Sequence, residues 1–182
     1  MPVGSVISGL RWRVHGGLAT WPASTITFAD YEITLAQAAN PIPSTSTTFA
    51  SNMLNPVMVR DGALSFGANS FPGGGIGPTP WGPLVQFQSS YTYAGGDLVL
   101  LVTHTGGDSS TITFLDAVDA SAANGYIAYI ATSFRAASGQ AFQAFMVTQL
   151  EYSVPTSVPE PAAVSTFAGA VGLAAFFRLR RR

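Results

Sequence analysis

The sequence predicts an all-β protein, built as an antiparallel β-sandwich of jelly-roll type over residues 1–153. Short runs of alternating apolar and polar residues recur along this region, and Gly, Pro, Ser and Asn separate them at short spacing. No long amphipathic helical pattern interrupts the series. The chain has 182 residues, of which 47% are hydrophobic, so it is long enough to build one domain with a core.

The first third of the chain holds clear strand patterns. Residues 24–35 alternate well, with a change of phase near Asp30 that predicts a bulge or a bend between two strands. Residues 57–59 and 63–66 are apolar runs on either side of Arg60-Asp61-Gly62, which predicts a hairpin turn. A short helical turn is expected between these patterns, within residues 47–54.

The middle of the chain is less regular. Residues 69–83 contain five Gly and four Pro, which argue against a regular element. Residues 98–103 form a nearly continuous apolar run, typical of a central strand of a sandwich. The Ala-rich residues 117–124 predict one helical turn. Further strands are expected within residues 84–88, 111–115, 126–130 and 141–152.

The charges are few and unevenly placed. Charged residues make up 9% of the chain, every basic residue is an Arg, and no Lys or Cys occurs. Residues 1–158 carry four Arg and eight acids, whereas residues 159–182 carry four Arg and one acid. This composition offers no basic surface, so no nucleic-acid partner is expected. A tail of opposite charge indicates a segment with a role of its own.

The residues that could ligate a metal do not cluster in the sequence. His15 and His104 lie far apart, whereas zinc sites need three or four ligands. Four residues with side-chain oxygens share one predicted loop: Asp116, Asp119, Ser121 and Asn124. Their spacing matches no calcium loop, so a solvated turn is favoured over a calcium site. We expect no metal site.

Catalytic motifs are also missing from the sequence. No Gly-x-Ser-x-Gly nucleophile elbow occurs, and a chain without Lys has no Walker loop. The glycines of residues 73–77 lack the Gly-x-Gly-x-x-Gly spacing of a dinucleotide-binding turn. The prediction is a protein that is no enzyme and uses no cofactor.

Several aromatic residues are candidates for a sugar-binding platform. They are Trp12, Trp21, Trp81, Tyr91 and Tyr93. Packing in the core or against loops is favoured for this group, because aromatics are ordinary strand residues. Trp81 lies in the Gly/Pro-rich loop, where burial is less assured, so Trp81, Tyr91 and Tyr93 are kept as candidate ligand contacts.

The C-terminal segment differs in composition from the rest of the chain. Residues 154–161 contain three prolines and predict an extended linker. Residues 162–177 follow without a charge, and Arg178, Arg180, Arg181 and Arg182 end the chain. The apolar run predicts a single transmembrane helix within residues 162–182, and a buried core helix is the alternative. The positive-inside rule then places the Arg cluster in the cytoplasm and residues 1–160 outside.

This order of features resembles the PEP-CTERM sorting signal of Gram-negative bacteria. The sorting motif is carried by Val158, Pro159, Glu160 and Pro161, ahead of the apolar run and the Arg cluster. Proteins with this signal are secreted, held in the membrane, and processed by an exosortase, and they are commonly linked to extracellular polysaccharide and biofilm matrix. The body resembles the β-rich extracellular domains that precede such tails, through residues 46–52, 60–62 and 91–100. The resemblance implies no enzymatic activity.

We therefore expect an exported, membrane-anchored structural or interaction protein of the cell envelope or extracellular matrix. The alternative is a carbohydrate-binding module, for exopolysaccharide, on the same anchor. The expected partners are the lipid bilayer, an exosortase-type peptidase that processes the tail, and in the alternative an extracellular polysaccharide. Residues 1–10 are uncharged and interrupted by Gly and Pro, unlike a signal peptide. Because the tail implies export, we expect the natural reading frame to continue upstream of Met1.

Overall fold

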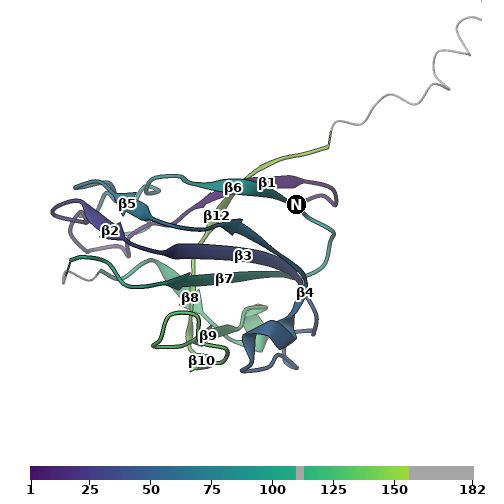
Figure 1. Cartoon of the computed structure of the whole chain (residues 1–182). Helices are drawn as coiled ribbons and strands as arrows, with labels where there is room; N and C mark the ends of the chain where they lie inside the picture. The colour runs from purple at the N-terminus through teal and green to yellow at the C-terminus, as the bar shows by residue number, and fades with distance from the viewer. Residues whose placement is uncertain (110–112, 156–182) are drawn as a thin grey trace, which may run out of the picture.

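A computed structural model describes residues 1–109 and 113–155, and within these ranges the chain is all-β (Figure 1). Every pairing between its strands is antiparallel, as the alternating patterns predict. The strands of the first half are β1 (Val6–Arg11), β2 (Ile26–Phe28), β3 (Tyr31–Ala38), β4 (Met53–Arg60), β5 (Leu64–Phe66) and β6 (Val85–Thr92). Those of the second half are β7 (Leu98–His104), β8 (Ala117–Asp119), β9 (Ala128–Ile130), β10 (Gln140–Phe142), β11 (Ala144–Met146) and β12 (Gln149–Ser153).

Two three-stranded sheets carry most of the fold. One has the strand order β12-β1-β6 and the other the order β4-β3-β7. Residues of both sheets join one core cluster, which includes Ile7 and Leu10 of β1 and Ile33 and Leu35 of β3, all fully buried. The two-residue period of a strand explains the pattern in β3, since it directs every second side chain to the same face. In β1 the strand register shifts between Ile7 and Gly9, which is why Ile7 and Leu10 are both buried although they are three residues apart.

The segment from β2 to β5 forms one long bent hairpin. β3 pairs with β4 and β2 pairs with β5, and the N–H of Tyr31 donates to the carbonyl of Gly62 where the two pairs meet. The predicted bend near Asp30 is confirmed. The predicted hairpin turn at Arg60-Asp61-Gly62 is wrong, because the strands on either side of it do not pair with each other. The strand before it, β4, pairs with β3, and the strand after it, β5, pairs with β2. These three residues lie opposite the bend near Asp30. Residues on both sides of a bend alternate like those of a hairpin, so the pattern alone did not separate the two cases.

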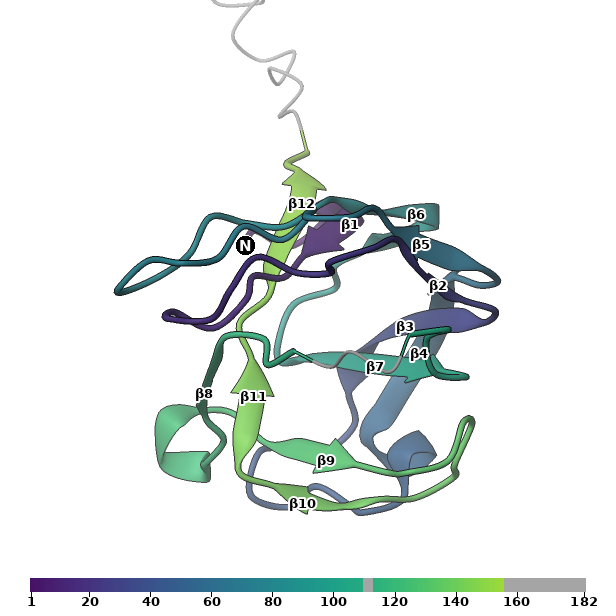
Figure 2. The ribbon, with the colours of Figure 1, turned by 90° about the vertical axis from the view of Figure 1, so that its left-hand side faces the viewer.

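Two short strand pairs, β8 with β11 and β9 with β10, lie beyond the β4-β3-β7 sheet (Figure 2). The segment between β9 and β10 is tied to the loop before β4, where the N–H of Phe49 donates to the carbonyl of Ala137 and that of Gly139 donates to Thr47. Each of these strands has three residues, and most of their side chains are partly or fully exposed. We call residues 117–146 the outer layer.

Other local predictions had mixed outcomes. The helical turn expected within residues 47–54 is a 3-10 helix at Phe49–Asn52, and residues 69–83 contain no strand. The turn expected within residues 117–124 is confirmed only at Ala122–Asn124, because Ala117–Asp119 forms β8. The apolar run 98–103 is an edge strand rather than a central one, since within the described ranges β7 pairs only with β3.

The C-terminal part of the chain is only partly described. The strand β12 is followed by residues 154 and 155, and the rest of the predicted linker, the sorting motif, the predicted transmembrane helix and the Arg cluster lie outside the described residues. Among the residues that the structure describes, no helix has the length and apolar character needed to cross a membrane.

Candidate functional site

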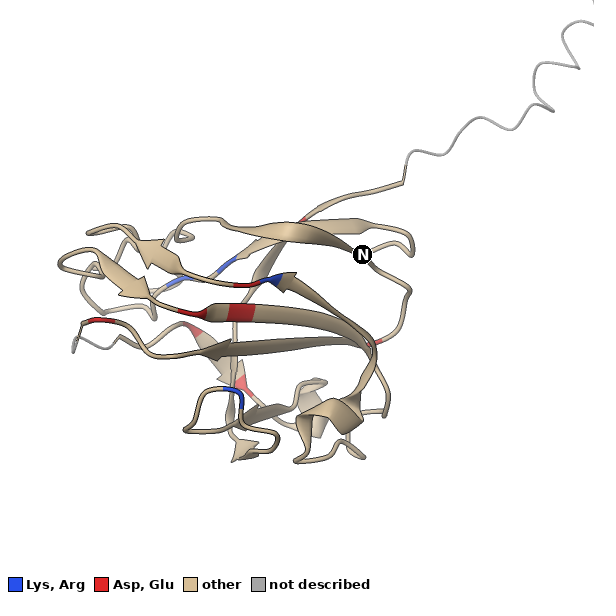
Figure 3. Cartoon of the chain, in the orientation of Figure 1, with Lys and Arg blue, Asp and Glu red and all other residues tan. Residues whose placement is uncertain are grey.

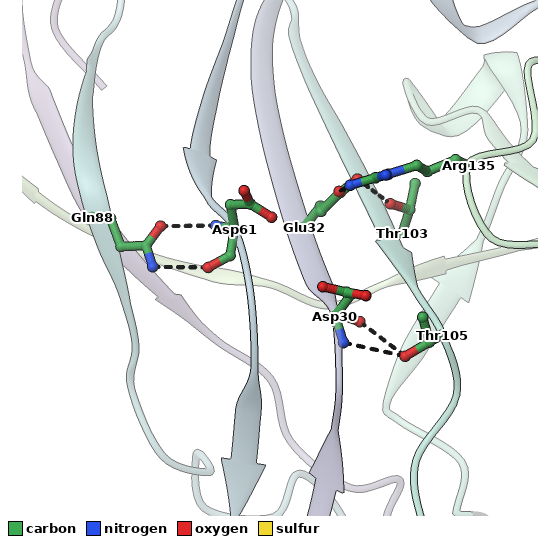
Figure 4. Close-up of polar contacts among 7 residues, drawn as sticks. All are labelled: Asp30, Glu32, Asp61, Gln88, Thr103, Thr105 and Arg135. Carbon is green, nitrogen blue, oxygen red and sulfur yellow. Dashed lines mark hydrogen bonds and ion pairs between the residues drawn. The ribbon is translucent and has the colours of Figure 1, made fainter.

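The most extensive polar arrangement in the described structure joins β3 to the outer layer (Figure 4). Glu32 lies between the core residues Tyr31 and Ile33, so strand alternation directs its side chain away from the core. Arg135 lies in the segment between β9 and β10 and adopts a φ of 54°. Its Nε donates to Glu32 Oε1 over 2.8 Å, and its Nη2 forms an ion pair with the same oxygen.

The second oxygen of Glu32 is also bonded. Thr103 of β7 donates its hydroxyl hydrogen to Oε2 over 2.9 Å, and the Glu32 side chain is only 8% exposed. The bond from Arg135 is the main reason that the pKa of the Glu32 carboxyl lies below its usual value. Glu32 is therefore ionised, and both of its carboxylate oxygens accept hydrogen bonds. It connects β3 to the outer layer and is a poor proton donor.

Two more acidic residues near Glu32 make hydrogen bonds through their backbone N–H groups (Figure 4). The backbone N–H of Asp30 donates to Thr105 Oγ1 over 3.2 Å, and that of Asp61 donates to Gln88 Oε1 over 2.9 Å. Figure 3 shows that charged residues are sparse over the described part of the chain. Within the described ranges, no group of three His, Cys, Asp or Glu could hold a metal ion. The hydrogen bond from Arg135 to Glu32, and the charges of Glu32, Asp30 and Asp61 near its guanidinium, raise the pKa of Arg135.

A second polar cluster surrounds Trp81. Arg13 Nε pairs with Asp116 Oδ2 over 2.6 Å, and its guanidinium lies 4.9 Å from the centre of the Trp81 ring. His15 Nδ1 lies 3.6 Å from the other oxygen of Asp116. One face of Trp81 is thus occupied by a cation within the protein. Asp116 was expected to lie in a solvated turn, and the structure shows that its Oδ2 is paired with Arg13.

The other candidate aromatics do not form an exposed row either. Tyr91 is 5% exposed and belongs to the core cluster, and burial raises the pKa of its phenol. Tyr93 donates its hydroxyl hydrogen to the carbonyl of Gly96 over 2.5 Å. Trp12 is 2% exposed and donates its indole N–H to Thr148 Oγ1 over 3.0 Å. Trp21 packs against Phe66 and Phe71. The structure does not bring Trp81, Tyr91 and Tyr93 together as one platform.

His104 has a structural environment. Its ring stacks on that of Tyr31 with a centroid distance of 5.4 Å and an interplanar angle of 10°. Its Nδ1 accepts a hydrogen bond from the N–H of Gly106 over 3.1 Å. Burial lowers the pKa of the imidazole, so the ring is neutral at pH 7. His15 belongs to the separate cluster around Asp116.

A shallow groove lies between β4 and β6, and sequence reasoning missed it. Its volume is about 300 Å³. It is lined by Gln37, Asn55, Val57, Ser90, Tyr91, Thr92 and Ala94. These residues come from three strands and one turn, so only the local Asn55-Pro56 pair, which is unusual inside a strand, gave a signal in the sequence.

The residues of the predicted sorting motif, Val158, Pro159, Glu160 and Pro161, lie outside the described ranges, as do Arg178, Arg180, Arg181 and Arg182. Comparison of the chain with protein-family models, with curated proteins and with solved structures finds no match.

Proposed function

We propose that this chain is an exported, non-enzymatic structural or interaction protein, anchored in the cell envelope through its C-terminal segment. The observation that carries the proposal is the order of features in the tail. A Pro-Glu-Pro motif at residues 159–161 precedes sixteen uncharged residues and a terminal cluster of four Arg. An apolar helix satisfies its own backbone hydrogen bonds, and the Arg cluster resists translocation, so the combination suits a membrane anchor.

The proposal has a finer structural part. The two main sheets form a jelly-roll-like sandwich, the linker follows, and residues 162–177 cross the membrane once. The sandwich is supported by the single core cluster that residues of both sheets share. A non-enzymatic role is supported by the use of Glu32 and Asp116 in ion pairs with Arg135 and Arg13. An exosortase-type peptidase would cleave near the Pro-Glu-Pro motif and release the domain to the extracellular matrix.

The alternative, a carbohydrate-binding module on the same anchor, loses its aromatic argument, since the candidate aromatics are buried or in contact with the protein itself. It gains support from the groove between β4 and β6, whose lining is rich in side-chain amides and hydroxyls.

The test uses the full chain behind a cleavable secretion signal, in a Gram-negative host that has an exosortase. The four terminal Arg are replaced by Ser in one variant and by Lys in a matched variant that keeps the charge. We expect the parent and the Lys variant in the membrane fraction or processed with a loss of roughly 2 kDa, corresponding to about twenty residues. The Ser variant should appear unprocessed in the medium, because its helix has no stop-transfer charge. Equal, firm membrane retention of the Ser variant would refute the role assigned to the cluster.

A further inference from the structure

Strands β4 and β6 lie side by side but belong to different sheets. Their Cα atoms come within 8 Å of one another, yet β4 pairs with β3 and β6 pairs with β1. At one end the side chain of Gln88 bridges to the backbone of Asp61. Toward the other end, within the described residues, no backbone hydrogen bond joins Asn55 or Val57 to β6. The groove of about 300 Å³ occupies this open end, and we call it the β4–β6 groove.

The polar side chains of the groove make no hydrogen bonds to other residues in the part of the chain that the structure describes. Two amides and three hydroxyls line the groove: Gln37, Asn55, Ser90, Tyr91 and Thr92. None of these five side chains makes a hydrogen bond to another residue of the described ranges. No charged residue contributes to the lining. Asn55, Ser90 and Thr92 are exposed, so their polar groups are accessible to a ligand. The volume of the groove is at the lower end of the range of about 300–1,000 Å³ for small-ligand sites.

The geometry of β4 argues against a peptide strand as the occupant. Asn55 has a φ of 49°, and Pro56 after it has no N–H to donate, so the edge of β4 is interrupted beside the groove. A strand inserted between two others needs them about 9.6 Å apart, twice the usual spacing, whereas Cα atoms of β4 and β6 come within 8 Å of one another.

The chemistry of the lining favours a neutral ligand rich in hydroxyl groups. Amide and hydroxyl side chains both donate and accept, which matches the mixed donors and acceptors of sugar hydroxyls. Val57, which is 37% exposed, and Ala94 offer small apolar surfaces for the C–H faces of a ring. We propose that the β4–β6 groove binds a short segment of an uncharged glycan. The glycan would be a partner of the exported protein proposed above. This proposal rests on the proposed function only for the location of the domain outside the cell.

The binding test measures the full chain, purified in a detergent without a sugar headgroup, on an array of neutral gluco-, manno- and galacto-oligosaccharides and of oligogalacturonate. Two variants remove groove side chains: the double variant Ser90→Ala/Thr92→Val, and Asn55→Gly, which keeps the positive φ free of strain. We expect binding of the parent to at least one neutral series and weakening of about tenfold in each variant, since single hydrogen bonds contribute on this scale.

The matched controls are residues that do not line the groove. Ser89→Ala removes a hydroxyl from the same strand, and Asn69→Gly removes an amide from a residue with a φ of 59°. Both should bind as the parent does. No binding to any neutral series, preference for oligogalacturonate, or equal weakening in the controls would each overturn the inference. Because the array requires no export, its outcome is independent of the fractionation test. Failure of the glycan proposal can therefore be distinguished from failure of the proposed anchoring.

Discussion

The side-chain amide of Gln88 bonds to both backbone groups of Asp61, accepting from its N–H over 2.9 Å and donating to its carbonyl over 2.8 Å (Figure 4). One side chain thus takes the place of a paired residue in a neighbouring strand. It connects β6 to the end of β4, although the two strands share no ladder. The β4–β6 groove lies farther along the same two strands, where Asn55 of β4 and Ser90 of β6 line it.

Replacing Gln88 with Leu should lower the free energy of unfolding by about 1–2 kcal/mol, because two hydrogen bonds are lost and water replaces them only partly. Urea denaturation measures the effect. Gln149→Leu is the control, since Gln149 is exposed on β12 and makes no side-chain hydrogen bond to another described residue. Equal stability of the two variants would show that the Gln88 bridge contributes nothing to the fold.

Much of the fold was accessible from the sequence because it depends on local signals. The all-β class, the bend near Asp30, the 3-10 turn at Phe49–Asn52 and the irregular loop 69–83 follow from alternation and from turn residues. Strand partners were less accessible. Whether residues 57–66 pair with one another or with residues 26–38 depends on packing across the core, and a two-residue period is the same in both arrangements.

Gly82→Ala should destabilise the protein by about 1–3 kcal/mol, the usual cost of overpacking a core. A Cβ at this position would overlap the ring of Phe71, which is 2% exposed, and would come within 3.0 Å of the carbonyl oxygen of Trp12. Gly67→Ala is the matched control, because a Cβ there meets nothing within 4 Å and no positive φ is required. Thermal unfolding followed by near-UV circular dichroism compares them. A neutral Gly82→Ala variant would contradict the close packing of the loop 69–83 on the core.

The polar sites were largely inaccessible from the sequence. Glu32 and Arg135 are 103 residues apart, and the sequence around each residue does not predict that the other is its partner. Trp81, Tyr91 and Tyr93 were identified as aromatic residues in suitable segments, but their exposure depends on neighbours such as Arg13 that lie far away in the chain. The β4–β6 groove arises from the separation of two strands, which is a tertiary property.

The neutral state of His104 should make stability depend on pH near neutrality. Burial lowers the pKa of the folded imidazole, so its contribution is present above the unfolded value, about 6.5, and declines as the pH falls below it. His104→Phe keeps a ring against Tyr31 but has no proton to bind. We expect the unfolding free energy of the parent, relative to this variant, to decrease between pH 7 and pH 5. Parallel curves over this range would contradict the prediction.

The ion pair of Glu32 with Arg135 should dominate the response to stronger acid. The folded pKa of Glu32 is lowered, so its stabilising contribution is complete above the unfolded value, about 4.3, and is lost as the pH falls through the folded value. Arg135→Gln removes the cation and leaves a buried carboxylate that, among the described residues, keeps only the hydrogen bond from Thr103. At pH 7 we expect this variant to be less stable than the double variant Glu32→Gln/Arg135→Gln, in which no buried charge remains.

The pH dependence separates this electrostatic effect from simple loss of packing. Gln at position 135 keeps the backbone cost of the positive φ, so the variants differ from the parent only in the side chain. In the Arg135→Gln variant, burial without a cation raises the pKa of Glu32, and acid neutralises the carboxyl. Chemical denaturation from pH 7 to pH 3 should therefore show the gap between parent and Arg135→Gln narrowing as the pH falls, while the double variant changes least. A gap that stays constant with pH would mean that Arg135 holds the outer layer by packing alone and that the charge of Glu32 has no part in it.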